Sequence, residues 1–140
     1  MFTGEYNFNL DDNHRLSIPN IYKKYLEETL VIVKGFEKCL YVYNMSAWRE
    51  IVDKVNNLPF TKAKNRMFSR SLNSGAYEIE IDSKGRICIG QKLIDHASLI
   101  KECVILGSGN HIEIWSKEEY DKYSAENQDV LALLGEEMDL

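Results

Sequence analysis

The sequence contains few residues that cross-link or interrupt a chain. Its 140 residues include two prolines and three cysteines, and no apolar run approaches the roughly 20 residues of a membrane-spanning helix. The cysteines form no Cys-x-x-Cys pair, and the histidines are equally scattered. We therefore expect reduced, buried thiols, no disulfide framework, no metal site and no cofactor. The first residues form neither a basic nor an apolar stretch, which predicts a cytoplasmic protein without a secretory signal or membrane association.

What the chain does contain is the composition of an ordinary globular protein. Hydrophobic residues make up 44% of the sequence and charged residues 28%, which supplies enough apolar material for a core and argues against general disorder. No low-complexity tract interrupts the chain. At this length the sequence predicts a single folded domain.

The charge is distributed unevenly along the chain. The formal net charge is −5, but residues 113–140 alone hold nine acidic side chains against two lysines, which leaves the preceding 112 residues with 15 basic and 13 acidic ones. The segment from Lys62 to Arg70 carries four positive charges and no acid. Screening limits the reach of each charge to about 8–10 Å in physiological salt, so a mildly basic body can still attract anions locally. From charge alone, the solvated face of a helix is the favoured interpretation of the basic segment.

The chain contains two copies of one unit. When the sequence is shifted by 71 residues, residues 4–11 align with residues 75–82, and Asp11 and Arg15 align with Asp82 and Arg86. Later apolar pairs and aromatic residues match after one inserted residue, so the similarity extends over roughly forty residues. Chance does not easily preserve the order of glycine, aspartate, arginine, apolar and aromatic positions over such a length.

Each copy has the pattern of short strands followed by helices. Apolar and polar residues alternate with period two at the start of each copy, and glycine-containing turns join the later strand pairs. We predict strands at residues 6–10, 16–18, 30–33 and 40–43, and again at 77–81, 87–89, 104–106 and 112–115. Helical spacing predicts short helices after Ile21 and Leu93, a helix through 48–55, and one over 61–72 that carries the basic segment. Ser116 and Glu119 form a capping box that predicts the start of a last helix.

The size of the two copies indicates how they are related. The units, residues 5–47 and 76–119, contain 43 and 44 positions, close to the limit of about 40 below which isolated domains rarely fold. We therefore expect them to pack as pseudo-symmetric halves of one barrel-like core, with strand edges open to further pairing. Residues 48–75 form a connecting helical segment. Residues 120–140 form an acidic tail, which is either an amphipathic helix docked on a neighbour or a frayed end.

The repeated turns are the candidate functional elements. The segments 11–15 and 82–86 each lie between two predicted strands. Gly85 suits a turn position with positive φ, and His14, which tolerates that conformation better than most residues, takes the same place in the first copy. Each turn begins with an aspartate that can close the loop or pair with the arginine of that loop. Spacing alone supports two interpretations equally: a repeated structural brace, or two fixed guanidinium groups that bind phosphate or the O6/N7 edge of guanine.

A set of motifs throughout the chain resembles the MraZ family. The residues that carry the resemblance are Gly4-Glu5-Tyr6, Leu10-Asp11-x-x-x-Arg15-Leu16-Ser17-Ile18-Pro19, Gly35-Phe36-x-x-Cys39-Leu40-x-Val42-Tyr43, Leu58-Pro59, Ser74-Gly75-Ala76, Asp82-x-x-Gly85-Arg86-Ile87 and Ile112-Glu113-Ile114-Trp115. The resemblance extends from Met1 to about Tyr123. It implies a β-rich α+β fold, namely a pseudo-symmetric swapped-hairpin barrel of the SpoVT-AbrB type, made of two internal repeats with short helices.

The same resemblance implies a function. Proteins of this family are bacterial transcriptional regulators, and their ring-shaped homo-oligomers bind short repeated boxes of double-stranded DNA in the promoter of the division and cell-wall gene cluster. For this chain the resemblance implies a nucleoid-associated protein that is not an enzyme. Carried over to the matching positions, Arg15 and Arg86 contact DNA, and Asp11 and Asp82 belong to the same DNA-binding motifs.

Two residues depart from the family pattern. His14 replaces the usual glycine, which bears on how deeply the first loop enters a groove, and Gly90 stands where a proline usually follows the second motif. At the loop tips we expect Asn13, His14 and Lys84 to assist the two arginines. The weaker candidates, which serve either DNA binding or subunit contacts, are Arg66 and Arg70.

Two other classes of function have less support. An enzyme would need a nucleophile and a base, for which Cys88 and His96 are the conceivable pair, but no signature supports them. An assembly module or an antitoxin-like protein is better supported than an enzyme. Antitoxins of this fold usually have one such unit and a separate toxin-binding tail, whereas two fused units with a connecting helix favour the stand-alone regulator.

Overall fold

The same succession of strands and helices occurs twice along the chain. The computed structural model describes residues 1–140. Its elements in chain order are β1 (Glu5–Asn9), β2 (Arg15–Ser17), α1 (Asn20–Lys23), β3 (Thr29–Lys34), β4 (Cys39–Asn44), α2 (Met45–Asn56), α3 (Ala63–Ser74), β5 (Ala76–Glu80), β6 (Arg86–Cys88), α4 (Gln91–Ala97), β7 (Glu102–Gly107), β8 (His111–Ser116) and α5 (Lys117–Glu137). All the predicted strands and helices are present, and their ends differ from the expected ones by a few residues.

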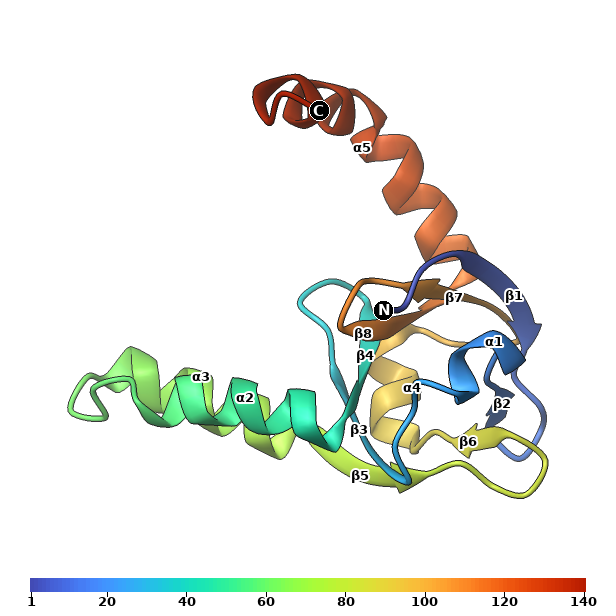
Figure 1. Ribbon diagram of the computed structural model, residues 1–140, viewed down its shortest axis with the longest axis horizontal. Helices are drawn as coiled ribbons and strands as arrows, with labels where there is room; N and C mark the ends of the chain where they lie inside the picture. Colours follow the sequence, from blue (N-terminus) through green and yellow to red (C-terminus); the bar gives the residue numbers. More distant parts are fainter.

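The two copies exchange strands within one sheet. Six strands pair in the order β1-β7-β8-β4-β3-β5, and every pair is antiparallel. The first strand of each copy therefore pairs with a strand of the other copy, β1 with β7 and β5 with β3. The remaining strands, β2 and β6, pair only with each other and form a separate ribbon (Figure 1). This exchange confirms the swapped-hairpin α+β fold that the resemblance implied, and it joins the two repeats into one structure as their size predicted.

The strand registers define a pseudo-two-fold axis. In the ribbon Leu16 lies opposite Ile87, and in the centre of the sheet Tyr41 lies opposite Glu113. The two partners of each pair occupy equivalent positions in the two copies. An axis that relates the copies therefore passes through both pairs, which places the ribbon and the centre of the sheet on one line of symmetry.

One hydrophobic core fills the space between the sheet and the ribbon. It comprises 19 buried residues, to which both copies contribute. Leu16 and Ile87 of the ribbon and Ile32 and Ile112 of the sheet are among its fully buried members. Burying a side chain of this size contributes roughly 1.5–3 kcal/mol, so the shared core holds the two copies together. The enclosure is barrel-like, although its hydrogen bonds are not continuous, because β1 and β5 remain edges of the sheet.

Two helical arms project from the sheet. One consists of α2 and α3, which run side by side, and the other is α5 (Figure 1). At the base of α5, the rings of Tyr120 and Tyr123 pack on Trp115 with centroid distances of 5.4 and 5.0 Å. The Ser116 Oγ accepts a hydrogen bond from the Glu119 N–H at 3.5 Å, which confirms the predicted start of this helix. None of the helices has the length and apolarity needed to cross a lipid bilayer.

The three cysteines differ in exposure. Cys39 and Cys103 are buried, and burial raises the pKa of Cys39 to about 12 and the pKa of Cys103 to about 11. Cys88 is exposed, because it lies on the side of β6 that faces away from the core. The prediction of three buried thiols is therefore wrong for Cys88. No group of three or more potential ligand side chains gathers to hold a metal ion.

Candidate nucleic-acid interface

The β2–β6 ribbon presents two arginines on the face that is turned away from the core. Leu16 and Ile87 point inward and are fully buried, so their neighbours point outward, because side chains alternate between the two faces of a strand. In the register of the ribbon, Arg15 and Arg86 are diagonal neighbours on this outer face. The alternation of apolar and polar residues thus brings together the two arginines that the repeat singled out.

An aspartate closes the loop that precedes each arginine. The Asp11 Oδ1 accepts hydrogen bonds from the backbone N–H groups of Asn13 at 2.9 Å and Arg15 at 2.8 Å. The Asp82 Oδ1 accepts the two equivalent bonds, both at 2.9 Å, from the second and fourth residues that follow it. Such bonds define the loop locally and bring the arginine to a fixed place at the start of its strand.

The two loop tips have the same backbone conformation, and each is hydrogen-bonded to the backbone of the other copy. His14 has a φ of 61° and Gly85 a φ of 76°, as predicted for this turn position. The His14 carbonyl oxygen accepts a hydrogen bond from the Ile89 N–H at 2.9 Å, and the Gly85 carbonyl oxygen accepts one from the Ile18 N–H at 3.0 Å. Each tip is therefore held by the other copy, and the loops lie side by side at the end of the molecule remote from the α2–α3 arm (Figure 1).

The two arginines are held differently. The Arg86 Nε donates to the Asp82 Oδ2 at 3.0 Å, and its Nη1 lies 3.7 Å from the Asp11 Oδ2. With 28% of its side chain exposed, Arg86 is fixed between carboxylates of both loops. The guanidinium of Arg15 is partly exposed and makes no hydrogen bond or ion pair within the chain. Asp82 therefore pairs with the arginine of its own loop, whereas Asp11 pairs with the arginine of the opposite loop.

This geometry lowers the pKa of both aspartates. For Asp11 the largest cause is the hydrogen bond from the Arg15 backbone N–H, and the positive charge of Arg86 acts in the same direction. For Asp82 the backbone N–H of Arg86 is again the largest cause, and the guanidinium of the same residue adds to it. Both carboxylates are therefore ionised at neutral pH and can orient a guanidinium through charge-assisted hydrogen bonds.

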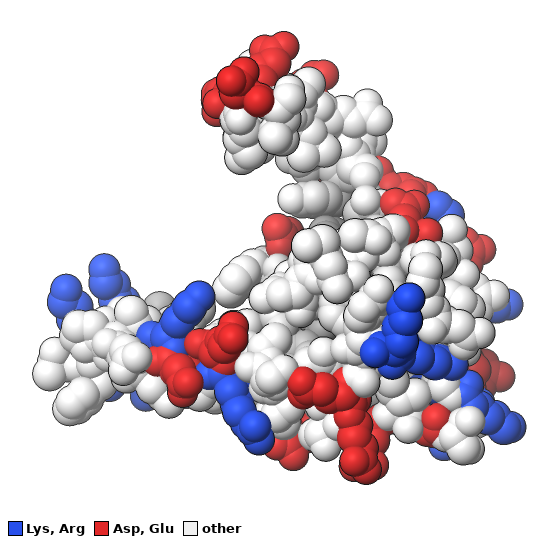
Figure 2. All heavy atoms as spheres, in the orientation of Figure 1, with Lys and Arg blue, Asp and Glu red and all other residues white.

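Polar side chains at the tips surround the arginines. Asn13 and Lys84 are exposed, and His14 is half-buried. The structure adds Lys23 of α1, because a side chain placed at Gly85 would collide with the Lys23 Nζ. No sequence signal pointed to Lys23. It belongs to the first copy, whereas Gly85 belongs to the second, and the position equivalent to Lys23 in the second copy holds no basic residue. Basic and acidic side chains are interspersed over this end of the molecule (Figure 2).

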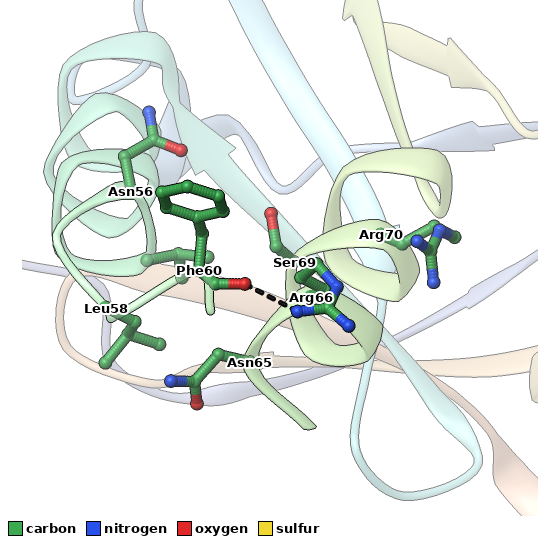
Figure 3. Close-up of a pocket in the computed structure, with 8 residues that line it drawn as sticks. Asn56, Leu58, Phe60, Asn65, Arg66, Ser69 and Arg70 are labelled. Atoms are coloured by element: carbon green, nitrogen blue, oxygen red, sulfur yellow. Dashed lines mark hydrogen bonds between the residues drawn. The ribbon is translucent and has the colours of Figure 1, made fainter. Parts of the chain in front are cut away.

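Arg66 and Arg70 lie elsewhere, on the α2–α3 arm. The Arg66 Nη1 donates hydrogen bonds to the carbonyl oxygens of Phe60 at 2.8 Å and Thr61 at 3.0 Å, so this arginine holds the turn between the helices (Figure 3). With Arg70 it lines a cavity of about 320 Å³ between α2 and α3. The structure does not bring either residue close to the ribbon, because the arm projects from the other end of the molecule (Figure 1).

Cys88 and His96 do not form a catalytic pair. The His96 Nε2 contacts the carbonyl oxygens of Gly35 and Glu37 at 3.1 and 3.2 Å. The Cys88 Sγ lies 3.8 Å from the carbonyl oxygen of Asn13 instead. Each side chain thus has its own backbone partner, and the two do not contact each other.

Comparison with known proteins matches both halves of the chain to one family. The family described as "MraZ protein, putative antitoxin-like" matches residues 1–71 and, a second time, residues 72–138. The chain belongs to the MraZ family. A relative from Desulforamulus reducens, named transcriptional regulator MraZ, is 42% identical over 126 residues, which cover 90% of this chain and 89% of the relative. The resemblance that the motifs predicted is confirmed, and the repeat of the MraZ family coincides with the structural repeat of this fold.

The departure from the MraZ pattern at Gly90 leaves the backbone path unchanged. Pro19 precedes α1 with φ −53° and ψ 133°, and Gly90 precedes α4 with φ −69° and ψ 157°. Both residues are extended caps at equivalent positions, so the glycine adopts the conformation that a proline would impose. The departure at His14 is likewise accommodated, since its φ is close to that of Gly85.

Acid is expected to remove the contribution of Asp11 and Asp82 to stability. An aspartate of an unfolded chain has a pKa of about 3.9, and the fold lowers the pKa of both residues. A lowered folded-state pKa adds stability that is complete above about pH 4 and is lost as the pH falls through the folded-state value. The double variant Asp11→Asn/Asp82→Asn is therefore expected to unfold at a lower urea concentration at neutral pH, and its difference from wild type to shrink below about pH 4.

The control for this titration is Asp53→Asn, which alters an exposed carboxylate of α2 that accepts no hydrogen bond. Because this carboxylate makes no contact that the substitution would remove, the variant is expected to unfold at the wild-type urea concentration at neutral pH. If the double variant differs from wild type by the same amount at neutral and acid pH, the two loop carboxylates do not stabilise the fold.

Proposed function

We propose that this chain is a transcriptional regulator that binds double-stranded DNA through the outer face of the β2–β6 ribbon. The observation that supports this most is the diagonal placement of Arg15 and Arg86 on that face, next to two closed loops. The major groove of B-DNA, about 12 Å wide, admits a two-stranded ribbon. A planar guanidinium in the groove can bond to guanine O6 and N7 or to a phosphate. The name of the relative from Desulforamulus reducens agrees with this function.

Within the ribbon we assign different tasks to the two arginines. Arg86 is positioned before binding by its two carboxylate partners, so it loses little side-chain freedom when it meets DNA. Arg15 keeps all its donors free and is suited to direct contact with a base edge. Lys84 and Lys23 are suited to phosphate contacts, which set the register on the duplex but do not select its sequence.

Self-association multiplies a site that is weak in one chain. The net charge of the chain is −5, and the ribbon supplies only a few positive charges. We propose a ring-shaped homo-oligomer that places several ribbons on short repeated boxes in the promoter of the division and cell-wall gene cluster. Linked contacts raise the overall affinity without new chemistry, provided that box spacing matches subunit spacing. Such a regulator acts in the cytoplasm at the nucleoid, without a cofactor and without catalysis.

Footprinting on the DNA upstream of the chain's own gene tests this function. We expect protection of short boxes at a regular spacing, and none on a fragment of equal length in which the boxes are scrambled. An assembly module or an antitoxin-like protein without DNA contacts would leave both fragments unprotected, and that result would contradict the proposal.

The affinity for promoter DNA is expected to fall steeply with salt. Each phosphate that the protein neutralises contributes about −0.9 to the slope of log K against log salt concentration. Lys84→Ala should therefore make the slope shallower by about that amount for each engaged subunit, whereas Lys101→Ala, an exposed lysine outside the ribbon, should not. A fluorescence-anisotropy titration at several salt concentrations measures both, and a flat wild-type slope would exclude binding through the DNA backbone.

A further inference from the structure

The C-terminal half of α5 has no partner within the chain. The helix contains no buried residue, and the two rings that pack on Trp115 of the sheet, those of Tyr120 and Tyr123, lie near its start. Figure 1 shows the rest of the helix projecting from the domain, with the C-terminus remote from the α2–α3 arm. Most of the stability of a helix in a protein comes from packing of one of its faces. A projecting segment of this length therefore needs a surface to pack against.

A stripe of apolar side chains runs along this projecting segment. Val130, Leu131, Leu134 and Met138 are separated by intervals that place them on one side of a helix. Their exposed fractions are 49, 63, 39 and 65%. The stripe thus has the spacing of an amphipathic helix that docks in a groove.

An apolar groove lies where the α2–α3 arm meets the sheet. It has a volume of about 270 Å³, and its lining includes Phe36, Trp48, Ile51, Phe68 and Leu72. The rings of Phe36 and Phe68 are stacked with their centroids 6.2 Å apart, and these side chains are 74 and 39% exposed. The stripe and the groove therefore both present large apolar side chains to solvent.

The charges around the two surfaces are opposite. Residues 124–140 contain five acidic and no basic side chains, whereas residues 45–74 contain six basic and two acidic ones. In Figure 2 acidic side chains gather at the tip of α5, and basic side chains lie along the other arm. Each arm also carries charge that its own helix dipole disfavours, with acids in the last turn of α5 and lysines at the start of α3. Contact between the arms would bring these opposite charges together and so offset both unfavourable interactions with the helix dipoles.

We propose that the apolar stripe of α5 docks in the groove on the α2–α3 arm of a second copy of this chain. The two surfaces belong to different parts of the chain, so the contact repeats from copy to copy and can close into a ring. The proposal rests on the self-association proposed above and names the surfaces that produce it. The loops of the ribbon lie away from the α2–α3 arm and stay free for DNA (Figure 1).

A charge exchange between full-length chains tests this contact. One variant, Lys54→Glu/Lys62→Glu/Lys64→Glu, reverses the net charge of residues 45–74 from +4 to −2. The other, Glu126→Lys/Glu136→Lys/Glu137→Lys, reverses the net charge of residues 124–140 from −5 to +1. Alone, each variant places like charges on both surfaces, and light scattering after size exclusion should report the mass of a single chain. An equimolar mixture restores opposite charges at every contact and should regain the wild-type mass.

Two further variants complete the experiment. Leu131→Glu/Leu134→Glu removes the stripe and should dissociate the assembly, whereas Lys92→Glu/Lys101→Glu reverses two exposed charges elsewhere and should not. If the wild-type assembly persists in the first three variants, the proposed docking is wrong, and α5 serves another occupant such as a different protein. A wild-type chain that is itself monomeric would instead overturn the proposed self-association and this contact with it.

Discussion

Replacing Arg15 with alanine is expected to abolish the promoter-DNA shift and to leave the fold and the oligomer intact. Its guanidinium is partly exposed and pairs with nothing in the chain, so its removal leaves no buried charge without a partner. A good bidentate contact with a base is worth about 1–3 kcal/mol of discrimination. Because the loss recurs in every bound subunit, the loss in two engaged ribbons alone would weaken binding roughly thirtyfold or more.

Arg86→Ala is expected to abolish the same shift with an additional structural effect. This substitution deletes a DNA contact and also leaves the carboxylates of Asp11 and Asp82 without the cation between them. The two carboxylates would then repel the DNA, and the loops would lose the ion pair that links them. We therefore expect a small loss of stability for this variant, but not for Arg15→Ala.

Gel shift on promoter DNA, with size exclusion as a check of assembly, measures both arginine variants. Lys101→Ala, which removes an exposed cation outside the ribbon and both arms, is the control and should bind as wild type does. If Arg15→Ala and Arg86→Ala both retain wild-type affinity, the ribbon is not the DNA-binding surface.

Ile87→Ala is expected to destabilise the fold more than any of the arginine or aspartate substitutions. The side chain is fully buried, lies opposite Leu16 on the pseudo-two-fold axis, and belongs to the core that both copies share. Truncating a buried isoleucine costs about 2–5 kcal/mol, and the tight enclosure between ribbon and sheet leaves little room for collapse. Native proteins are stable by only about 5–15 kcal/mol, so this is a large share of the total.

Urea unfolding at one fixed protein concentration measures this loss, because self-association makes stability depend on concentration. The matched control is Ile100→Ala, since Ile100 is 79% exposed, and its effect should stay within about 0.5 kcal/mol. Equal unfolding midpoints for the two variants would show that the ribbon is not an integral wall of the core.

The local features of the fold were predicted from the sequence because they depend on periodicity and turn chemistry. The alternation around Leu16 and Ile87 indicated which residues enter the core and therefore which face carries Arg15 and Arg86. The place of His14 in the repeat predicted its positive φ. These signals lie within a few residues of one another, so they can be recognised without knowledge of the rest of the chain.

The particular contacts between the two copies became visible only in the folded molecule. The residue-by-residue pairing of β1 with β7 and of β5 with β3, the ion pair between Arg86 and Asp11, and the approach of Lys23 to Gly85 all join residues from different copies. No local pattern specifies such pairs, because they form only when one core closes over both copies and fixes the strand register. The amino-acid order thus specified the parts of the DNA-binding candidate, and closure of the shared core placed those parts next to one another.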